Sequence, residues 1–198
     1  MEKPFAPACE RNQDAILKAF QNFYGDEAKL IFEVGSGTGQ HALYMANNMK
    51  SVKWITSDLE ENHQGIKMWM EGSVHGNIQG PKHFKIGGTT DFEKHCDVVF
   101  LANVIHIMSW KECKTLFKYL GRNLKKAAEV LFYGPFNYDG QFTSEGNRSL
   151  DAWLKETYPG SGIRSFEDVS AQMEKNGLSL VEDYEMPANN RVLRFKKN

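Results

Sequence analysis

The sequence predicts an α/β fold in which a mostly parallel β-sheet carries helices on both faces. Residues 30–34 are mostly apolar and run into a loop with glycine at every second position, after which an amphipathic segment begins. Residues 97–102 form a nearly continuous apolar run, typical of a parallel strand covered on both faces. Two strand-like segments, 178–186 and 191–195, predict a closing hairpin.

Length and charge narrow the class of protein further. A chain of 198 residues can bury roughly 70% of its unfolded surface in one core, so we expect a single domain over residues 1–198. The 24 basic and 25 acidic residues nearly cancel, which argues against a nucleic-acid or anionic membrane partner. The sequence has no apolar run long enough for a membrane span, and we expect a cytoplasmic protein. The three cysteines lack metal-ligand spacing, so no structural metal is predicted.

The first predicted element is a helix capped by residues 12–14 and ended by Gly25, with an apolar stripe that includes Phe20. Within residues 1–27, which we expect to form a helical cap over a ligand site, Arg11 and Asn12 precede the stripe. These two residues have two possible roles. They either cap the helix and form a surface ion pair, or they contact a ligand.

Residues 52–57 predict the second strand, followed by Asp58. Asp58 lies 23 positions after Gly35, close to the ~20-residue offset at which a carboxylate meets ribose hydroxyls in nucleotide-binding folds. The alternative is that Asp58 caps the next helix. A weaker third strand is expected at residues 83–86, before Gly87.

The fourth strand, residues 97–102, ends in a short loop that contains Asn103 and His106. Residues after the carboxyl end of a central parallel strand face the ligand crevice of such folds. A capping-box sequence at Ser109 then predicts a helix.

Residues 129–133 predict the fifth strand, which Gly134 and Pro135 are expected to end. The polar stretch 137–147 is a candidate for substrate contacts. Further helices are predicted around Trp153 and from Phe166 to Gly177.

The glycine spacing limits which ligand the loop can hold. Glycines stand at the first, third and fifth positions, whereas the dinucleotide fingerprint requires the sixth, where this chain has Gln40. No Gly-Lys-Ser/Thr follows, which excludes a Walker loop. The spacing from Glu33 to Gly39 resembles the first motif of class I S-adenosylmethionine-dependent methyltransferases.

The whole chain resembles the methyltransferase-like 26 family, also catalogued as domain of unknown function 938. This resemblance implies a Rossmann-like class I methyltransferase fold, with seven strands in the order 3-2-1-4-5-7-6, and S-adenosylmethionine as cofactor. Two stretches depart from the usual pattern: residues 86–89 lack an Asp suited to the adenine, and Ala127-Ala128 replaces Gly-Gly. The matching stretches are Glu10-Arg11-Asn12, residues 35–41, Ser57-Asp58, residues 103–106, residues 133–136, Asn147 with Asp151, Gly162-Ile163-Arg164 and residues 186–190.

From the resemblance and the residues together, we expect a role for each candidate in binding the cofactor. The glycine-loop residues should hold its methionine part, Asp58 its ribose and Asn103 its amino group, while Arg11 and Asn12 close over its carboxylate or the acceptor. The expected cofactor-binding residues of the loop are Glu33, Gly35, Ser36, Gly37 and Gly39.

His106 is the candidate general base, because an unperturbed imidazole titrates near ~6.5. A core or capping histidine is the open alternative. Tyr133 and Asn137 are candidates for the acceptor pocket. The predicted function is methyl transfer to a small molecule, and the alternative is a catalytically silent cofactor-binding protein on the same fold.

Overall fold

The computed structural model describes residues 2–198, which contain a mixed sheet of eight strands. The strand order is β3-β2-β1-β4-β5-β8-β7, and the short β6 pairs with β5 outside this path. The predicted α/β class and strand order are therefore confirmed, with β6 as an addition that hydrophobic patterning could not reveal. The strands are β1 (Leu30–Val34), β2 (Lys53–Asp58), β3 (Ile78–His83), β4 (Val98–Ala102), β5 (Glu129–Asn137), β6 (Arg164–Ser165), β7 (Leu178–Met186) and β8 (Asn190–Lys197).

The pairing directions follow the predicted pattern. β1 pairs with β2 and β4 in parallel, and β2 pairs with β3 in parallel. β8 is antiparallel to both β5 and β7, which gives the closing hairpin. The chain divides into two compact units, one up to Phe100 and one from Leu101 onward, and each is described by itself.

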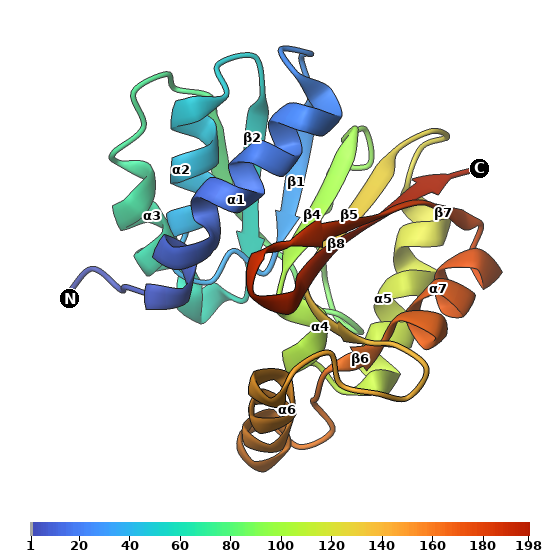
Figure 1. The fold of residues 1–198 in the computed structure, drawn as a ribbon. Helices are drawn as coiled ribbons and strands as arrows, with labels where there is room; N and C mark the ends of the chain where they lie inside the picture. Colours follow the sequence, from blue (N-terminus) through green and yellow to red (C-terminus); the bar gives the residue numbers. More distant parts are fainter. Residues whose placement is uncertain (1) are drawn as a thin grey trace. The chain divides into compact units, whose positions relative to one another are not determined.

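In the first unit, helices α1 (Pro7–Tyr24), α2 (Gln40–Asn48) and α3 (His63–Met70) gather beside β1, β2 and β3 (Figure 1). A 3-10 turn, η1 (Glu60–Asn62), precedes α3. Phe20 of α1 packs edge-on against Phe100, with ring centroids 5.1 Å apart, and also contacts Trp54. This aromatic cluster forms the core of the unit.

The start of α1 corrects one prediction. The helix begins at Pro7, so residues 12–14 lie inside it and cap nothing. Proline is favoured in the first turn of a helix, where its missing N–H has no partner to lose. The predicted end at Gly25 is confirmed, because its N–H donates to Gln21 O.

The position of the third strand corrects a second prediction. β3 is Ile78–His83 and not residues 83–86, and it carries Pro81 within it. β3 lies at the edge of the sheet, where a residue without an N–H is tolerated. Gly80 is needed there, because a Cβ on it would lie 2.6 Å from Thr56 O.

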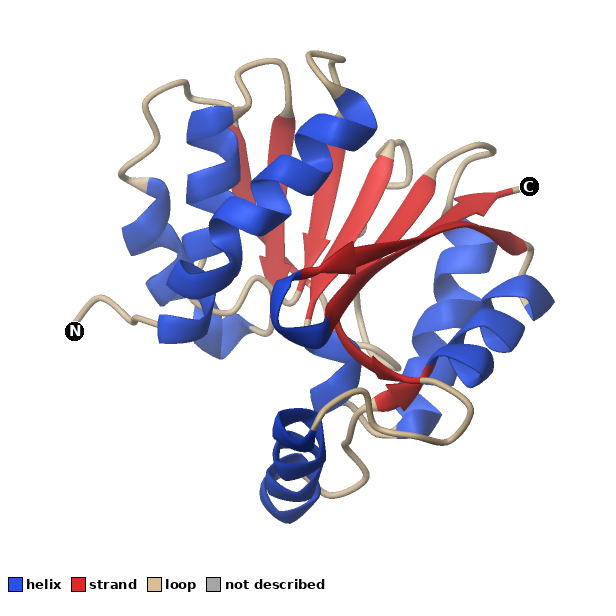
Figure 2. Cartoon of the chain, viewed as in Figure 1, coloured by secondary structure: helices blue, strands red, loops and turns tan. Residues whose placement is uncertain are grey.

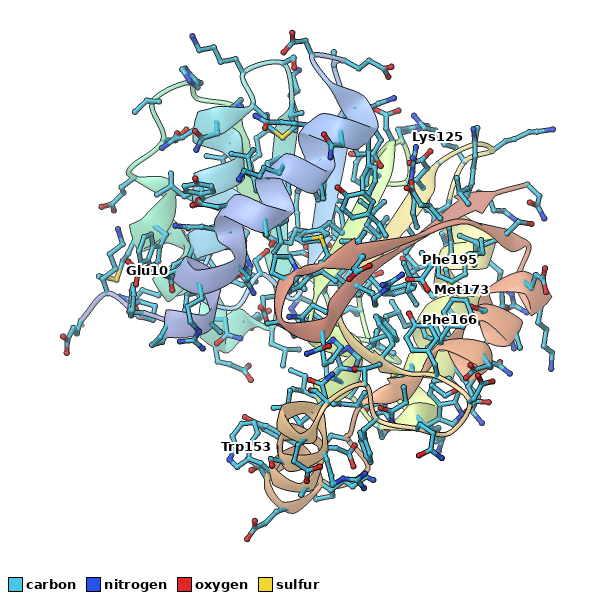
Figure 3. The ribbon with its side chains drawn as sticks, viewed as in Figure 1. Glu10, Lys125, Trp153, Phe166, Met173 and Phe195 are labelled. Atoms are coloured by element: carbon cyan, nitrogen blue, oxygen red, sulfur yellow. The ribbon has the colours of Figure 1, made fainter. Side chains whose placement is uncertain are left out.

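In the second unit, helices α5 (Trp110–Asn123) and α7 (Phe166–Lys175) pack together and lie beside β7 and β8 in Figure 2. Figure 3 shows Met173 of α7 near Phe195 of β8, and both side chains are fully buried. The remaining elements of this unit are α4 (Val104–Ile107), α6 (Glu145–Thr157) and the 3-10 turn η2 (Pro187–Asn189).

β5 also differs from its predicted end. It continues through Gly134 and Pro135 to Asn137 and is buried almost throughout. β8 supplies antiparallel partners as far as the pair Pro135–Asn190, so pairing outweighs the breaker residues. This extension carries Asn137 to the end of a strand.

Candidate functional site

The glycine loop has the backbone conformation that its spacing predicts. Gly35, Gly37 and Gly39 all have positive φ, at 70°, 58° and 89°. A Cβ on Gly39 would lie 3.1 Å from the Cα of Ile66, so bare backbone lets α3 approach the loop. A Cβ on Gly37 would meet nothing within 4 Å. The loop therefore keeps an open face at Gly37.

Asp58 stands beside that open face. Its Oδ2 accepts a 2.7 Å hydrogen bond from the N–H of Gly37, while Oδ1 accepts from the N–H of Leu59 and the amide of Asn62. The carboxylate thus ties the loop to the end of β2. Three donors leave part of its capacity for accepting hydrogen bonds free.

Glu33 lies beneath the loop and is 1% exposed. Its Oε2 accepts from the hydroxyl of Ser36 at 2.7 Å and from the indole N–H of Trp54 at 3.1 Å. Burial raises the pKa of Glu33 to about 7, against the two hydrogen bonds that favour its ionised form. Glu33 is therefore poised between its neutral and charged forms near neutral pH.

Residues of α1 contact the same loop and the helix that follows it. Asn12 Oδ1 lies 2.6 Å from Nε2 of His41, and the amide oxygen of Gln40 accepts from the N–H of Ala6. Burial lowers the pKa of His41 to about 4, so the ring is neutral and donates to Asn12. Arg11 is exposed. Asn12 thus stands next to the loop helix.

Within the second unit, Asn103 and His106 converge on one glycine. A Cβ on Gly134 would lie 2.5 Å from Nε2 of His106 and 2.9 Å from Oδ1 of Asn103. The N–H of Asn103 donates to the carbonyl of Tyr133 at 2.8 Å. The absence of a Cβ at Gly134 gives the imidazole its place against β5.

His106 is 2% exposed, and neither ring nitrogen has a hydrogen-bond partner. Its ring packs edge-on against Phe136, with centroids 5.2 Å apart. Burial and, secondarily, the charge of Arg164 lower the pKa of His106 to about 3. The imidazole is neutral at physiological pH, with one nitrogen free to accept a hydrogen bond.

The two acceptor-pocket candidates are placed differently. Tyr133 is 4% exposed within β5, so its side chain belongs to the buried part of the sheet. Asn137 ends β5, and its side-chain oxygen is buried without a partner. An unpaired buried amide oxygen is costly and points to a polar ligand group or water.

The sequence assigned no role to the β7–β8 turn. A cavity of about 600 Å³ is lined by Tyr138, Thr143 and residues 185–191. Ala188 and Asn189 in the turn both have positive φ, and the carbonyl of Asn189 accepts from Asn147. The resemblance had marked residues 186–190, and this was the only signal for the cavity.

A family described as "Protein of unknown function (DUF938)" matches residues 3–197. The chain belongs to this family. Among residues 2–198 of this DUF938 chain, no helix has the length and apolar character needed to cross a membrane. The same residues contain no group of three or more His, Cys, Asp or Glu side chains placed to hold a metal ion.

Three solved structures show how widely the fold of this DUF938 chain is shared. Mitomycin 7-O-methyltransferase MmcR is 13% identical, with a TM-score of 0.83, over 96% of this chain and 54% of its own. An O-methyltransferase family 2 protein from Planctomyces limnophilus in complex with apigenin is 13% identical, with a TM-score of 0.83, over 97% and 59%. Human N-acetylserotonin methyltransferase in complex with SAM is 16% identical, with a TM-score of 0.80, over 96% and 53%.

At these identities the likeness establishes a Rossmann-like methyltransferase fold and not an activity. The DUF938 chain spans little more than half the length of these solved chains.

Proposed function

We propose that this chain is an S-adenosylmethionine-dependent methyltransferase that acts on a small-molecule acceptor. The observation that carries the proposal is the open face at Gly37 beside the Asp58 carboxylate. A cofactor with a ribose and no phosphates needs room and hydrogen-bond acceptors at this point, and the residues present supply both. The fold shared with methyltransferases supports the same assignment.

The proposed roles follow the chemistry of each group. Asp58 accepts hydrogen bonds from the ribose hydroxyls. Glu33 and Ser36 hold the loop in the shape that receives the methionine part, and Asn103 accepts from its amino group. Asn12 and Arg11 of α1 close over the carboxylate, with residues 1–27 as the cap of one domain over residues 1–198.

The cofactor supplies a methyl group already activated by the positive charge on sulfur. The protein's task is therefore to orient the acceptor and exclude water, an effect that reaches ~7–11 kcal/mol in ideal cases. His106 is the proposed base: it accepts the hydrogen bond of the acceptor, takes its proton as the new bond to carbon forms, and releases that proton to water because a pKa of about 3 does not retain it. Tyr133 and Asn137 complete the acceptor pocket in this proposal.

Calorimetric titration of S-adenosylmethionine tests the cofactor assignment through Gly37. In Gly37→Ala, one methyl group fills the open face, so we expect at least ~10-fold weaker binding. Gly76→Ala is the matched control, because Gly76 has a similar φ of 64° and equally open surroundings. Both variants bear the same backbone strain of about 1 kcal/mol. Equal affinity in the two variants would remove the loop from the site.

Asp58→Asn gives a second test at the ribose. It keeps the size of the side chain and removes its charge, so affinity should fall by ~1 kcal/mol or more. The control is Asp26→Asn on an exposed loop. Affinity unchanged by Asp58→Asn would exclude the ribose contact.

Turnover requires its own experiment. Release of S-adenosylhomocysteine is measured over a panel of small phenols, thiols, amines and carboxylates. Turnover of at least one class supports the methyltransferase. Cofactor binding without turnover across the panel would favour the silent cofactor-binding protein.

A further inference from the structure

Arg164 closes the short turn that carries His106. Its Nε donates to the carbonyl of Ile105 at 2.9 Å, and its terminal nitrogen donates to the carbonyls of Met108 and Gly160. The contacts with Ile105 and Met108 satisfy backbone carbonyls at the end of α4 that the helix itself leaves unpaired, and Gly160 lies on the loop before β6. The same guanidinium lies 5.8 Å from the ring centroid of Trp110. One side chain thus binds the second half of the segment between β4 and α5.

The segment around Arg164 is held in turn by α6. Asp151 Oδ1 accepts from the N–H of Ile163 at 2.8 Å, and its other oxygen pairs with Lys155 at 2.7 Å. The N–H of Gly162 donates to the carbonyl of His106 at 2.9 Å. Gly162 has no room for a Cβ, which would lie 2.8 Å from Asp151. Residues 160–164 are therefore fixed by α6 and in turn hold the turn that carries His106.

The surroundings of the imidazole are otherwise apolar. Phe136 covers one side, Gly134 approaches Nε2, and Cys113 of α5 donates to the neighbouring carbonyl of Ile105. Arg164 on β6 and Asp151 on α6 are the charged groups that act on the ring, and Lys155 partly neutralises Asp151. Burial and the charge of Arg164 both disfavour a second proton on His106.

We propose that Arg164 is a positioning residue for His106: it fixes the α4 turn so that the buried, unpartnered imidazole offers a hydrogen-bond acceptor to methyl acceptors with a neutral donor, above all a hydroxyl group. A hydroxyl satisfies the unpartnered ring nitrogen. An ammonium group would meet the positive charge of Arg164 in an apolar setting. This inference rests on the proposed methyltransferase function for its acceptor class, whereas the state of His106 can be measured without turnover.

Histidine NMR titration of the full chain tests the positioning role directly, and His106→Gln assigns the resonance. In the wild type, the His106 signal should not titrate between pH 5 and 8. In Arg164→Gln, the lost charge and loosened turn should raise its midpoint by about one unit or more. A wild-type signal that titrates near pH 6.5, or an identical midpoint in Arg164→Gln, would overturn the proposal.

Further variants separate the effect of the Arg164 charge from that of its hydrogen bonds, and they keep the test valid if Arg164→Gln does not fold. Arg164→Lys keeps the charge but cannot reach all three carbonyls, so it should hold the low midpoint while losing part of the rate. Gly134→Ala places a methyl group against Nε2 and should shift the His106 signal with Arg164 intact. Arg148→Gln, an exposed arginine on α6, is the control and should behave as wild type. An unaltered His106 signal in folded Gly134→Ala, or the full wild-type rate in folded Arg164→Lys, would also contradict the proposal.

The acceptor class is tested with the panel that measures S-adenosylhomocysteine release. Wild type should methylate hydroxyl acceptors with a flat pH profile between pH 5.5 and 8. Arg164→Gln should lose at least ~10-fold in kcat with a smaller change in KM, and the acid-side fall of its rate should begin at a pH about one unit higher than in the wild type. Turnover of amines alone would overturn the inferred class while leaving the methyltransferase function intact. No turnover at all, with normal NMR behaviour, would contradict only the proposed activity.

Discussion

Glu33 is under two opposing demands. Its carboxyl is fully buried beneath the glycine loop, yet its hydrogen bonds from Ser36 and Trp54 favour the ionised form. Because the pKa of Glu33 is raised from 4.5 to about 7, its contribution to stability is fully present below pH 4.5 and is lost as the pH rises through 7. The protein therefore keeps a carboxylate that weakens it at alkaline pH.

Glu33→Gln should separate stability from binding. Relative to wild type, the variant should gain on the order of 3 kcal/mol between pH 5 and pH 8, measured by urea unfolding. S-adenosylmethionine affinity at pH 8 should fall, because the loop that receives the methionine part loses the charged acceptor of the Ser36 hydroxyl. A variant with wild-type affinity would leave Glu33 as a purely structural residue.

At the residue scale, the sequence indicates the glycine loop and Asp58 but not Arg164. The loop is visible because spacing along the chain is itself the signal. Arg164 binds carbonyls of Ile105 and Met108, more than 50 positions earlier, and no local pattern reports such a contact. The resemblance marked Arg164 without giving it a role. The roles of all predicted site residues stay predictions until binding and turnover are measured.

At the element scale, two glycines in helices have opposite meanings. Gly121 lies in α5 where a Cβ would come 2.3 Å from the carbonyl of Asn176, just beyond the end of α7. Gly146 lies in α6, where the nearest atom to a Cβ is 3.7 Å away. The close approach of α5 to the end of α7 therefore requires glycine at position 121, whereas α6 does not require glycine at position 146.

Alanine at the two positions should change stability in opposite directions. Gly146→Ala should raise the free energy of unfolding by roughly 0.5–1 kcal/mol through helix propensity. Gly121→Ala should lower it by roughly 1–3 kcal/mol, because α7 must move. Chemical unfolding of both variants measures the two changes. If Gly121→Ala is instead more stable than the wild type, the end of α7 shifts to make room for the methyl group at no cost in stability.

Element types could be predicted from periodicity, whereas several boundaries could not. Ser109 caps α5 as predicted, because capping is a local interaction, and Ser165 caps α7 in the same way. The Gly134-Pro135 pair is expected to end β5, but antiparallel pairing with β8 keeps both residues in the strand. α6 exposes Trp153, which projects outward in Figure 3, although Trp153 is one of the apolar residues around which the helix is predicted. Tertiary context decided each of these cases.

At the scale of the whole molecule, two buried histidines make folding sensitive to acid. Burial lowers the pKa of His41 to about 4 and that of His106 to about 3, from 6.5. Their contribution to stability is present above pH 6.5 and is lost as the pH falls toward those values, because only the unfolded chain takes up the protons.

The double variant His41→Gln/His106→Gln should flatten this dependence. Between pH 5 and 6, the slope of unfolding free energy against pH should fall by up to ~2.7 kcal/mol per pH unit, since two protons no longer distinguish the states. Urea unfolding at several pH values measures the slope. Because carboxylates elsewhere are common to both proteins, an unchanged slope would mean that both imidazoles protonate freely in the native state.

The two edge strands limit what can join this sheet. A foreign strand approaching β3 would find the ladder interrupted at Pro81, which has no N–H to offer. At β7, the register shift in the pairing with β8 makes the strand irregular between Leu180 and Glu182, and charged side chains that pair with Arg191 and Arg194 line it. Both borders therefore resist edge-to-edge aggregation, and crowding many copies together should not seed fibrils through this sheet.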